Sequence, residues 1–175
     1  MPGTQWILAL GYLGVYTTLE DSTYLAAARE ALEEAQEGLE ATGLGIAAMP
    51  VILSGGRVLM MEGDYQQAAA EFERCVGISY PDEEARHELF LGLARSHRKL
   101  KELDQAESWV QRILDVAPLA PRALAEAARI AWARGNHAEA RETMHRALDV
   151  WQVADPGFVY AERARETLAG WDRVS

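Results

Sequence analysis

Apolar residues recur along this chain at intervals of four and then three positions, and each group follows a short turn sequence. In the segment that begins at Gly63, the small Ala68 is followed by the bulky Phe72 and then by Cys75. The same spacing returns twice, in Ala106, Val110 and Ile113 and in Ala140, Met144 and Ala147. Residues three and four positions apart lie on one face of a helix, so each group predicts a helix that buries one side.

A partner helix is predicted upstream of each group. Its pattern is a bulky residue, a small residue and a variable one, in the sets Ile52, Gly56 and Leu59; Phe90, Ala94 and His97; and Leu124, Ala128 and Ala131. We expect the small residue to lie where two helices cross. The offset between equivalent alanines is 38 residues (positions 68 and 106) and then 34 (positions 106 and 140). The chain is therefore predicted to be all-α and built from helical hairpins.

This template resembles the tetratricopeptide repeat family, whose repeat is 34 residues long. The resemblance covers about residues 49–152. The family's small residue is carried by Gly56, Ala94 and Ala128, and its conserved alanine by Ala68, Ala106 and Ala140. The family's early tryptophan is replaced by Ile52, Phe90 and Leu124, and its aromatic near the turn becomes His137 in the last repeat. The resemblance implies stacked hairpins in an α-α superhelix that binds another protein.

The repeat boundaries predict one domain over residues 1–175. Residues 5–42 resemble a degenerate first repeat. Asp155 and Pro156 form a helix-start sequence, because Asp caps helices and Pro fits the first helical position. The predicted order is a degenerate repeat at 5–42, repeats at 49–82, 87–119 and 121–152, and a C-terminal capping helix at 156–171.

Composition narrows the function further. The formal net charge of −10 argues against nucleic-acid binding, which usually needs a basic surface. The one cysteine, Cys75, has no partner for an internal disulfide, and we expect it to be a buried thiol in a reducing compartment. The apolar stretch 6–16 lacks a basic lead, contains two glycines and is too short to span a bilayer, so we expect a soluble, cytoplasmic protein without membrane contact.

No sequence motif predicts catalysis. Gly43 and Gly45 imitate a dinucleotide-binding loop, but no strand is predicted before them. The four histidines lack metal-binding spacing, and no serine has the context of a nucleophile. We therefore expect no enzyme activity, no cofactor and no metal.

One basic pattern points to a partner. Arginine follows the small crossing residue in all three repeats, as Arg57, Arg95 and Arg129. The family resemblance implies that this position faces a concave groove, so the three would form a row that Arg98 and Arg122 widen. Guanidinium groups bind carboxylates in bidentate fashion, and the predicted ligand is an acidic peptide or helix of another protein. The other interpretation is that these are ordinary surface arginines.

A second functional hypothesis remains open. The apolar N-terminal helix, with Trp6, Leu10, Leu13 and Tyr16, is a possible interface for self-association. The chain would then be a self-associating or regulatory segment of a larger signalling protein, and a homo-oligomer is possible through this helix.

Overall fold

The computed structural model describes residues 5–19, 22–42, 49–77, 83–153 and 157–173. Within these ranges every regular element is helical and no strand occurs, which confirms the all-α prediction. None of the described helices is long and apolar enough to cross a bilayer. The elements are α1 (Gln5–Leu19), α2 (Ser22–Thr42), α3 (Met49–Glu62), α4 (Tyr65–Glu73), α5 (Glu83–Lys99), α6 (Leu103–Leu114), α7 (Pro121–Ala133), α8 (His137–Val150), the 3₁₀ turn η2 (Trp151–Val153) and α9 (Val159–Asp172).

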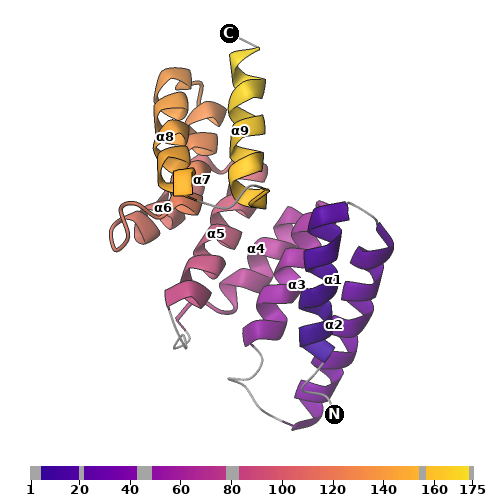
Figure 1. Ribbon diagram of the computed structural model, residues 1–175. Helices are drawn as coiled ribbons and strands as arrows, with labels where there is room; N and C mark the ends of the chain where they lie inside the picture. The colour runs from indigo at the N-terminus through magenta and orange to yellow at the C-terminus, as the bar shows by residue number, and fades with distance from the viewer. Residues whose placement is uncertain (1–4, 20–21, 43–48, 78–82, 154–156, 174–175) are drawn as a thin grey trace. The chain divides into compact units, whose positions relative to one another are not determined.

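The chain divides into two compact units, Met1–Ser96 and His97–Ser175. In the first unit, α1 with α2 and α3 with α4 form antiparallel hairpins (Figure 1). Small and branched side chains fill the core between α1, α2 and α3: Ala9, Leu13, Ala28, Leu32, Ala35, Val51 and Val58. The glutamates between positions 30 and 37 of α2 face solvent. An ion pair between Arg29 and Glu62 joins α2 to the end of α3.

The first unit also holds one large aromatic ring in a narrow space. Phe72 of α4 is fully buried, and its ring lies against Gly56 of α3 and Gly92 of α5. A Cβ atom on either glycine would come within 2.6 Å of the ring. Gly56 therefore lies at a helix crossing, as the repeat pattern predicts.

In the second unit, α7 and α8 form a hairpin against which α9 packs (Figure 1). The core is rich in alanine, because Ala128, Ala140, Ala147 and Ala164 are all fully buried. Ala106 of α6 is buried too, as expected of a repeat alanine. The ring of Trp171 stacks on Trp132 with centroids 4.5 Å apart, and so fixes the end of α9 on α7.

Equivalent turns have equivalent backbone conformations. Gly63, Lys101 and Gly135 each precede the second helix of a hairpin, with φ of 86°, 68° and 87°. Glycine adopts this left-handed conformation readily, whereas Lys101 adopts it at a cost. The recurrence of one conformation at three template positions supports the repeat register.

Two expectations need correction. The predicted capping helix included residues 157 and 158, but α9 begins at Val159, after Gly157 with φ of 85° and an extended Phe158. Leu13 is fully buried in its own unit, so it does not belong to an exposed interface. Asp155, Pro156, the Gly43–Gly45 motif and the side chains of Trp6 and Tyr16 lie outside the described part of the chain.

Candidate functional site

Two of the predicted arginines meet at a buried carboxylate. Glu126 of α7 is only 1% exposed. The Nε of Arg98, at the end of α5, donates to Glu126 Oε1 at 2.6 Å, and Arg129 NH1 lies 3.6 Å from Glu126 Oε2. The two arginine side chains are 18% and 23% exposed. The structure thus brings together two arginines that are 31 positions apart (98 and 129).

Glu126 carries one negative charge between two guanidinium groups. A buried carboxylate is stable only when paired and hydrogen-bonded, and here both conditions are met. Because one anion faces two cations, the cluster of Arg98, Glu126 and Arg129 has a formal charge of +1. The pairing also holds both guanidinium groups in place, which reduces the entropy that a ligand would have to overcome.

The remaining predicted arginines have different surroundings. Arg122 lies two helical turns before Arg129 on the same face of α7, and its guanidinium carbon is 4.4 Å from the ring centre of Tyr160 on α9. Arg57 and Arg95 are half-exposed and follow the buried Gly56 and Ala94. They belong to the other compact unit, so their alignment with Arg129 stays a prediction.

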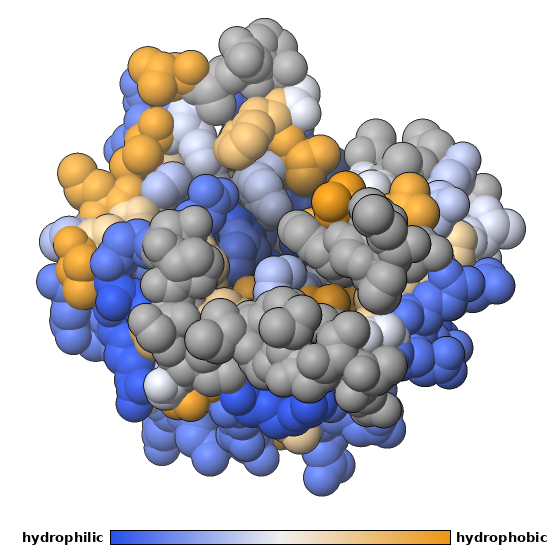
Figure 2. All heavy atoms as spheres, turned by 90° about the horizontal axis from the view of Figure 1, so that it is seen from below, coloured by the Kyte–Doolittle hydropathy of each residue, from blue (hydrophilic) through white to orange (hydrophobic). Residues whose placement is uncertain are grey.

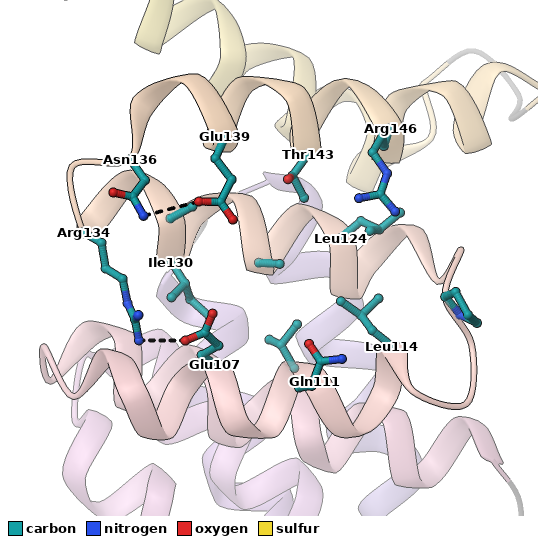
Figure 3. A pocket seen from close by; sticks show the side chains of 14 residues that line it. Glu107, Gln111, Leu114, Leu124, Ile130, Arg134, Asn136, Glu139, Thr143 and Arg146 are labelled. Atoms are coloured by element: carbon teal, nitrogen blue, oxygen red, sulfur yellow. Dashed lines mark hydrogen bonds and ion pairs between the residues drawn. The ribbon is translucent and has the colours of Figure 1, made fainter.

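A groove of about 360 Å³ lies between α6, α7 and α8 (Figure 3). Its floor is formed by Leu124, Ala127 and Ile130 of α7 together with Leu114 of α6. Polar side chains of α6 and α8 form the walls and point into it from both sides (Figure 3). No predicted site residue lines this groove.

The charged side chains along the groove differ in whether they form ion pairs. Arg134 pairs with both Asp104 and Glu107, at 2.6 and 2.8 Å, so one guanidinium group faces two carboxylates and the three residues carry a formal charge of −1. Glu139 of α8 accepts only a hydrogen bond from the Asn136 amide, at 3.3 Å. Arg146, two turns further along α8, is exposed and has no carboxylate partner among the described residues. One unneutralised anion and one unneutralised cation therefore lie along the α8 wall.

The groove and the arginine cluster occupy opposite faces of α7. Each residue turns a helix by about 100°, so positions 124, 127 and 131 face one way and positions 122, 126 and 129 face nearly the other, while Ile130 lies between them, one turn after Glu126. The hairpin α7–α8 thus offers two distinct surfaces. In the view of Figure 2, the hydrophilic side chains lie mostly in the lower half of the picture and the apolar ones mostly in its upper half.

Sequence reasoning missed both Glu126 and the groove. For Glu126 a signal existed, because it is the one charged residue in an otherwise apolar run from Ala123 to Ala128. For the groove there was none, since each wall residue has the character of an ordinary surface residue. Only the packing of α6 and α8 on either side of α7 turns them toward one another.

The other candidate chemistry has structural explanations. His97 is buried, and its Nδ1 lies 2.7 Å from Glu102 Oε2, where it ties the end of α5 to the start of α6. No group of metal-binding residues occurs in the described ranges. Cys75 is a buried thiol, as predicted, and burial raises its pKa above the ordinary value.

Comparison with known proteins agrees with the repeat pattern. A family model described as a tetratricopeptide repeat matches residues 59–125, from the end of α3 to the start of α7. The matched segment includes Ala68 and Ala106, to which the resemblance in sequence assigns the family's conserved alanine. No curated protein matches the chain.

Proposed function

We propose that this chain binds a partner protein rather than catalysing a reaction, because residues 59–125 match a model of the tetratricopeptide repeat family, whose members are generally scaffolds for protein–protein interaction. The proposed ligand is an acidic peptide or an acidic helix of the partner. Its contact residues would lie in the concave groove implied by the family: Arg57, Arg95, Arg98, Arg122 and Arg129.

The observation that carries this proposal is the convergence of Arg98 and Arg129 on the buried Glu126. This convergence brings two guanidinium groups to one place, and their side chains remain 18% and 23% exposed. A guanidinium group has five N–H donors in a fixed plane and binds carboxylates in bidentate fashion. A carboxylate of the ligand would bind the exposed part of these guanidinium groups.

The charge of the rest of the protein favours the same kind of partner. The chain has a formal net charge of −10, so a cationic surface on it stands out from its surroundings. Such a patch attracts acidic ligands, while the acidic remainder repels them from other surfaces. Specificity would therefore depend on where the partner's acidic residues lie.

The experiment is affinity capture of a ligand from the native cell, followed by affinity measurements at two salt concentrations. We expect Arg95→Ala and Arg129→Ala each to weaken binding, by roughly 2–5 kcal/mol if the lost contact is buried and by less at the rim. Binding should also weaken in high salt, because the Debye length falls from about 8 Å at physiological ionic strength to about 3 Å at 1 M. The matched control is Arg173→Ala, an exposed arginine at the end of α9. Unchanged binding in both test variants, with the fold intact, would contradict the proposal.

A second candidate function rests on α1. Ile7 and Leu8 are 54% and 51% exposed, which is unusual for large apolar side chains on a helix that also buries Leu13. This surface supports the alternative in which the chain is a self-associating or regulatory segment of a larger signalling protein. We expect a double substitution, Ile7→Asp with Leu8→Asp, to halve the mass in solution if α1 forms a homodimer. A monomeric parent protein would exclude that interface.

A further inference from the structure

The outer side of α1 carries an uncharged, exposed surface, which we call the α1 face and which consists of Ile7, Leu8, Gly11 and Gly14. Its two large side chains are 54% and 51% exposed, and a Cβ atom added to either glycine would meet nothing within 4 Å. On its other side, α1 buries Ala9 and Leu13. The α1 face is therefore an apolar helix surface with room beside its large side chains for another backbone to approach closely.

The corresponding face of α3 shows what such a surface holds in this fold. The same spacing recurs on α3, 44 positions later, where Val51, Gly55 and Val58 correspond to Ile7, Gly11 and Gly14. Val51 and Val58 are buried in a core shared with α1 and α2, and a Cβ atom on Gly55 would lie 3.8 Å from Gln36 of α2. With this face, α3 packs against the second helix of the preceding hairpin, as α7 packs against α6 in the second unit. The fold thus uses this face of a first helix to hold a second helix.

A helix also suits the α1 face better than an extended peptide does. The backbone of α1 is hydrogen-bonded within its own helix, so an extended peptide would place unpaired N–H and C=O groups over the exposed Ile7 and Leu8. A helix pairs these groups internally and presents residues i, i+3, i+4 and i+7 on one side. Gly11 and Gly14 leave space for its backbone to come close.

The neighbouring helix α2 places acidic side chains beside the α1 face. Within the first unit, α2 packs against both α1 and α3 (Figure 1). Arg29 and Gln36 contact α3 and so mark one edge of α2. At about 100° per residue, Glu30 and Glu34 lie across the buried side of α2 from that edge, next to α1, and both are exposed. Because Gln5–Leu19 contains no charged residue, the described side chains bordering the α1 face are acidic on this flank.

We propose that the α1 face binds an amphipathic helix of a partner protein, in the place that α2 occupies on α3. Large apolar side chains of the partner helix cover Ile7 and Leu8, and basic residues line its flank beside Glu30 and Glu34. A second copy of this chain fits less well, because its own α1 has no basic residue to offer. The surface is separate from the arginine cluster, whose proposed ligand is acidic, so either proposal can fail without the other.

The test is selection from a displayed library of alanine-based helical peptides. Positions i, i+3, i+4 and i+7 encode apolar residues of different sizes, and the positions on both flanks encode either Lys or Glu. On the unmodified protein, we expect Lys on one flank and Leu, Ile or Met in the centre. On the variant Glu30→Lys with Glu34→Lys, that flank should change to Glu, and a peptide selected on the unmodified protein should bind about three- to thirtyfold more weakly. The matched control is Glu142→Lys with Glu166→Lys, which changes the net charge equally at exposed positions of α8 and α9 and should keep the Lys preference.

A second variant tests the close approach at the glycines. Gly11→Leu adds apolar surface but fills the space that the partner helix needs, so a selected peptide should bind about five- to hundredfold more weakly. Non-specific hydrophobic adsorption would instead increase. The matched control is Gly170→Leu in α9, where a new Cβ also meets nothing within 4 Å, and it should leave binding unchanged. Arg129→Ala should leave it unchanged too, which separates this surface from the arginine cluster.

Several results would overturn the proposal. They are the absence of any enriched peptide, the same flank charges on the parent and the charge-reversed variant, or binding to the Gly11→Leu variant as tight as to the parent. Tolerance of a proline in the middle of a selected peptide would also contradict it, because proline breaks a helix. A mass in solution that is double in the parent and single in Gly11→Leu would assign the α1 face to a second copy of the chain instead. Circular dichroism of each variant confirms that the helices remain intact.

Discussion

Replacing Gly92 with alanine tests the packing around Phe72. Gly92 lies inside α5, where alanine is favoured over glycine by about 1 kcal/mol on helix propensity alone. Yet an alanine Cβ at this position would lie 2.6 Å from Cζ and 2.7 Å from Cε2 of the Phe72 ring. The sign of the effect depends on which contribution is larger.

The ring has little room to move away. Phe72 is 1% exposed, and on Gly56 a Cβ would also come within 2.6 Å of the same ring. Overpacking of a core generally costs 1–3 kcal/mol, and a rigid ring confined from two helices belongs near the upper end of that range. After subtraction of the propensity gain, we expect Gly92→Ala to lower the free energy of unfolding by about 1–2 kcal/mol.

The assay is urea denaturation followed by circular dichroism at 222 nm. The matched control is Gly55→Ala in α3, where the nearest atom to a new Cβ is Gln36 Nε2 at 3.8 Å. This control keeps the propensity gain without the clash, so it should stabilise by up to about 1 kcal/mol. Adding Phe72→Leu to Gly92→Ala should relieve the clash and make the two substitutions less costly together than their sum. If Gly92→Ala were as stabilising as Gly55→Ala, the argument about the confined ring would be refuted.

Four further predictions concern single positions. Lys101→Gly should raise the melting temperature, because removing a side chain from the left-handed backbone conformation recovers about 1 kcal/mol. Ala140→Leu should lower the unfolding free energy by about 1–3 kcal/mol through overpacking, while the exposed Ala138→Leu should not, as thermal melts of the pair would show. Glu126→Ala leaves two guanidinium groups without their buried carboxylate and should cost about 3–5 kcal/mol in denaturant unfolding. Cys75 should react slowly with a thiol reagent in the folded protein at neutral pH, because burial raises its pKa and keeps the thiol protonated. The reaction rate should rise only at a pH above that at which an ordinary exposed thiol ionises.

The hairpins could be predicted because their signal is local. A small residue and two apolar residues at helical spacing define a buried helix face whatever the rest of the chain does. The burial of Ala68, Ala106 and Ala140 follows directly from that spacing. The start of α9 was less predictable. The Asp155-Pro156 sequence favours a helix start, whereas Gly157 has a left-handed backbone conformation, with φ of 85°, that does not continue a helix.

The candidate surfaces were less accessible from sequence, since they depend on contacts between distant residues. Arg98 and Glu126 are 28 positions apart, and the sequence around neither residue indicates that the two form an ion pair. Likewise, Glu107 and Arg146 have the character of solvent-facing residues until α7 places their helices on either side of one groove. The arginine pattern was visible in the sequence, but the carboxylate that organises two of its members was not.

The confined ring of Phe72 also bears on how such repeats can be recombined. The position of Phe72 is occupied by Val110 and Met144 in the later hairpins, while the crossing position of Gly56 is occupied by Ala94 and Ala128. The largest side chain in the second helix, Phe72, thus occurs with the smallest residue in the first helix, Gly56. The size of one residue compensates for the size of the other. A hybrid array that inherits Phe72 together with an alanine at the crossing would be overfilled, whereas one that inherits Gly56 with valine would contain a void. Shuffling of these repeats should therefore succeed only when both positions are transferred from the same parent.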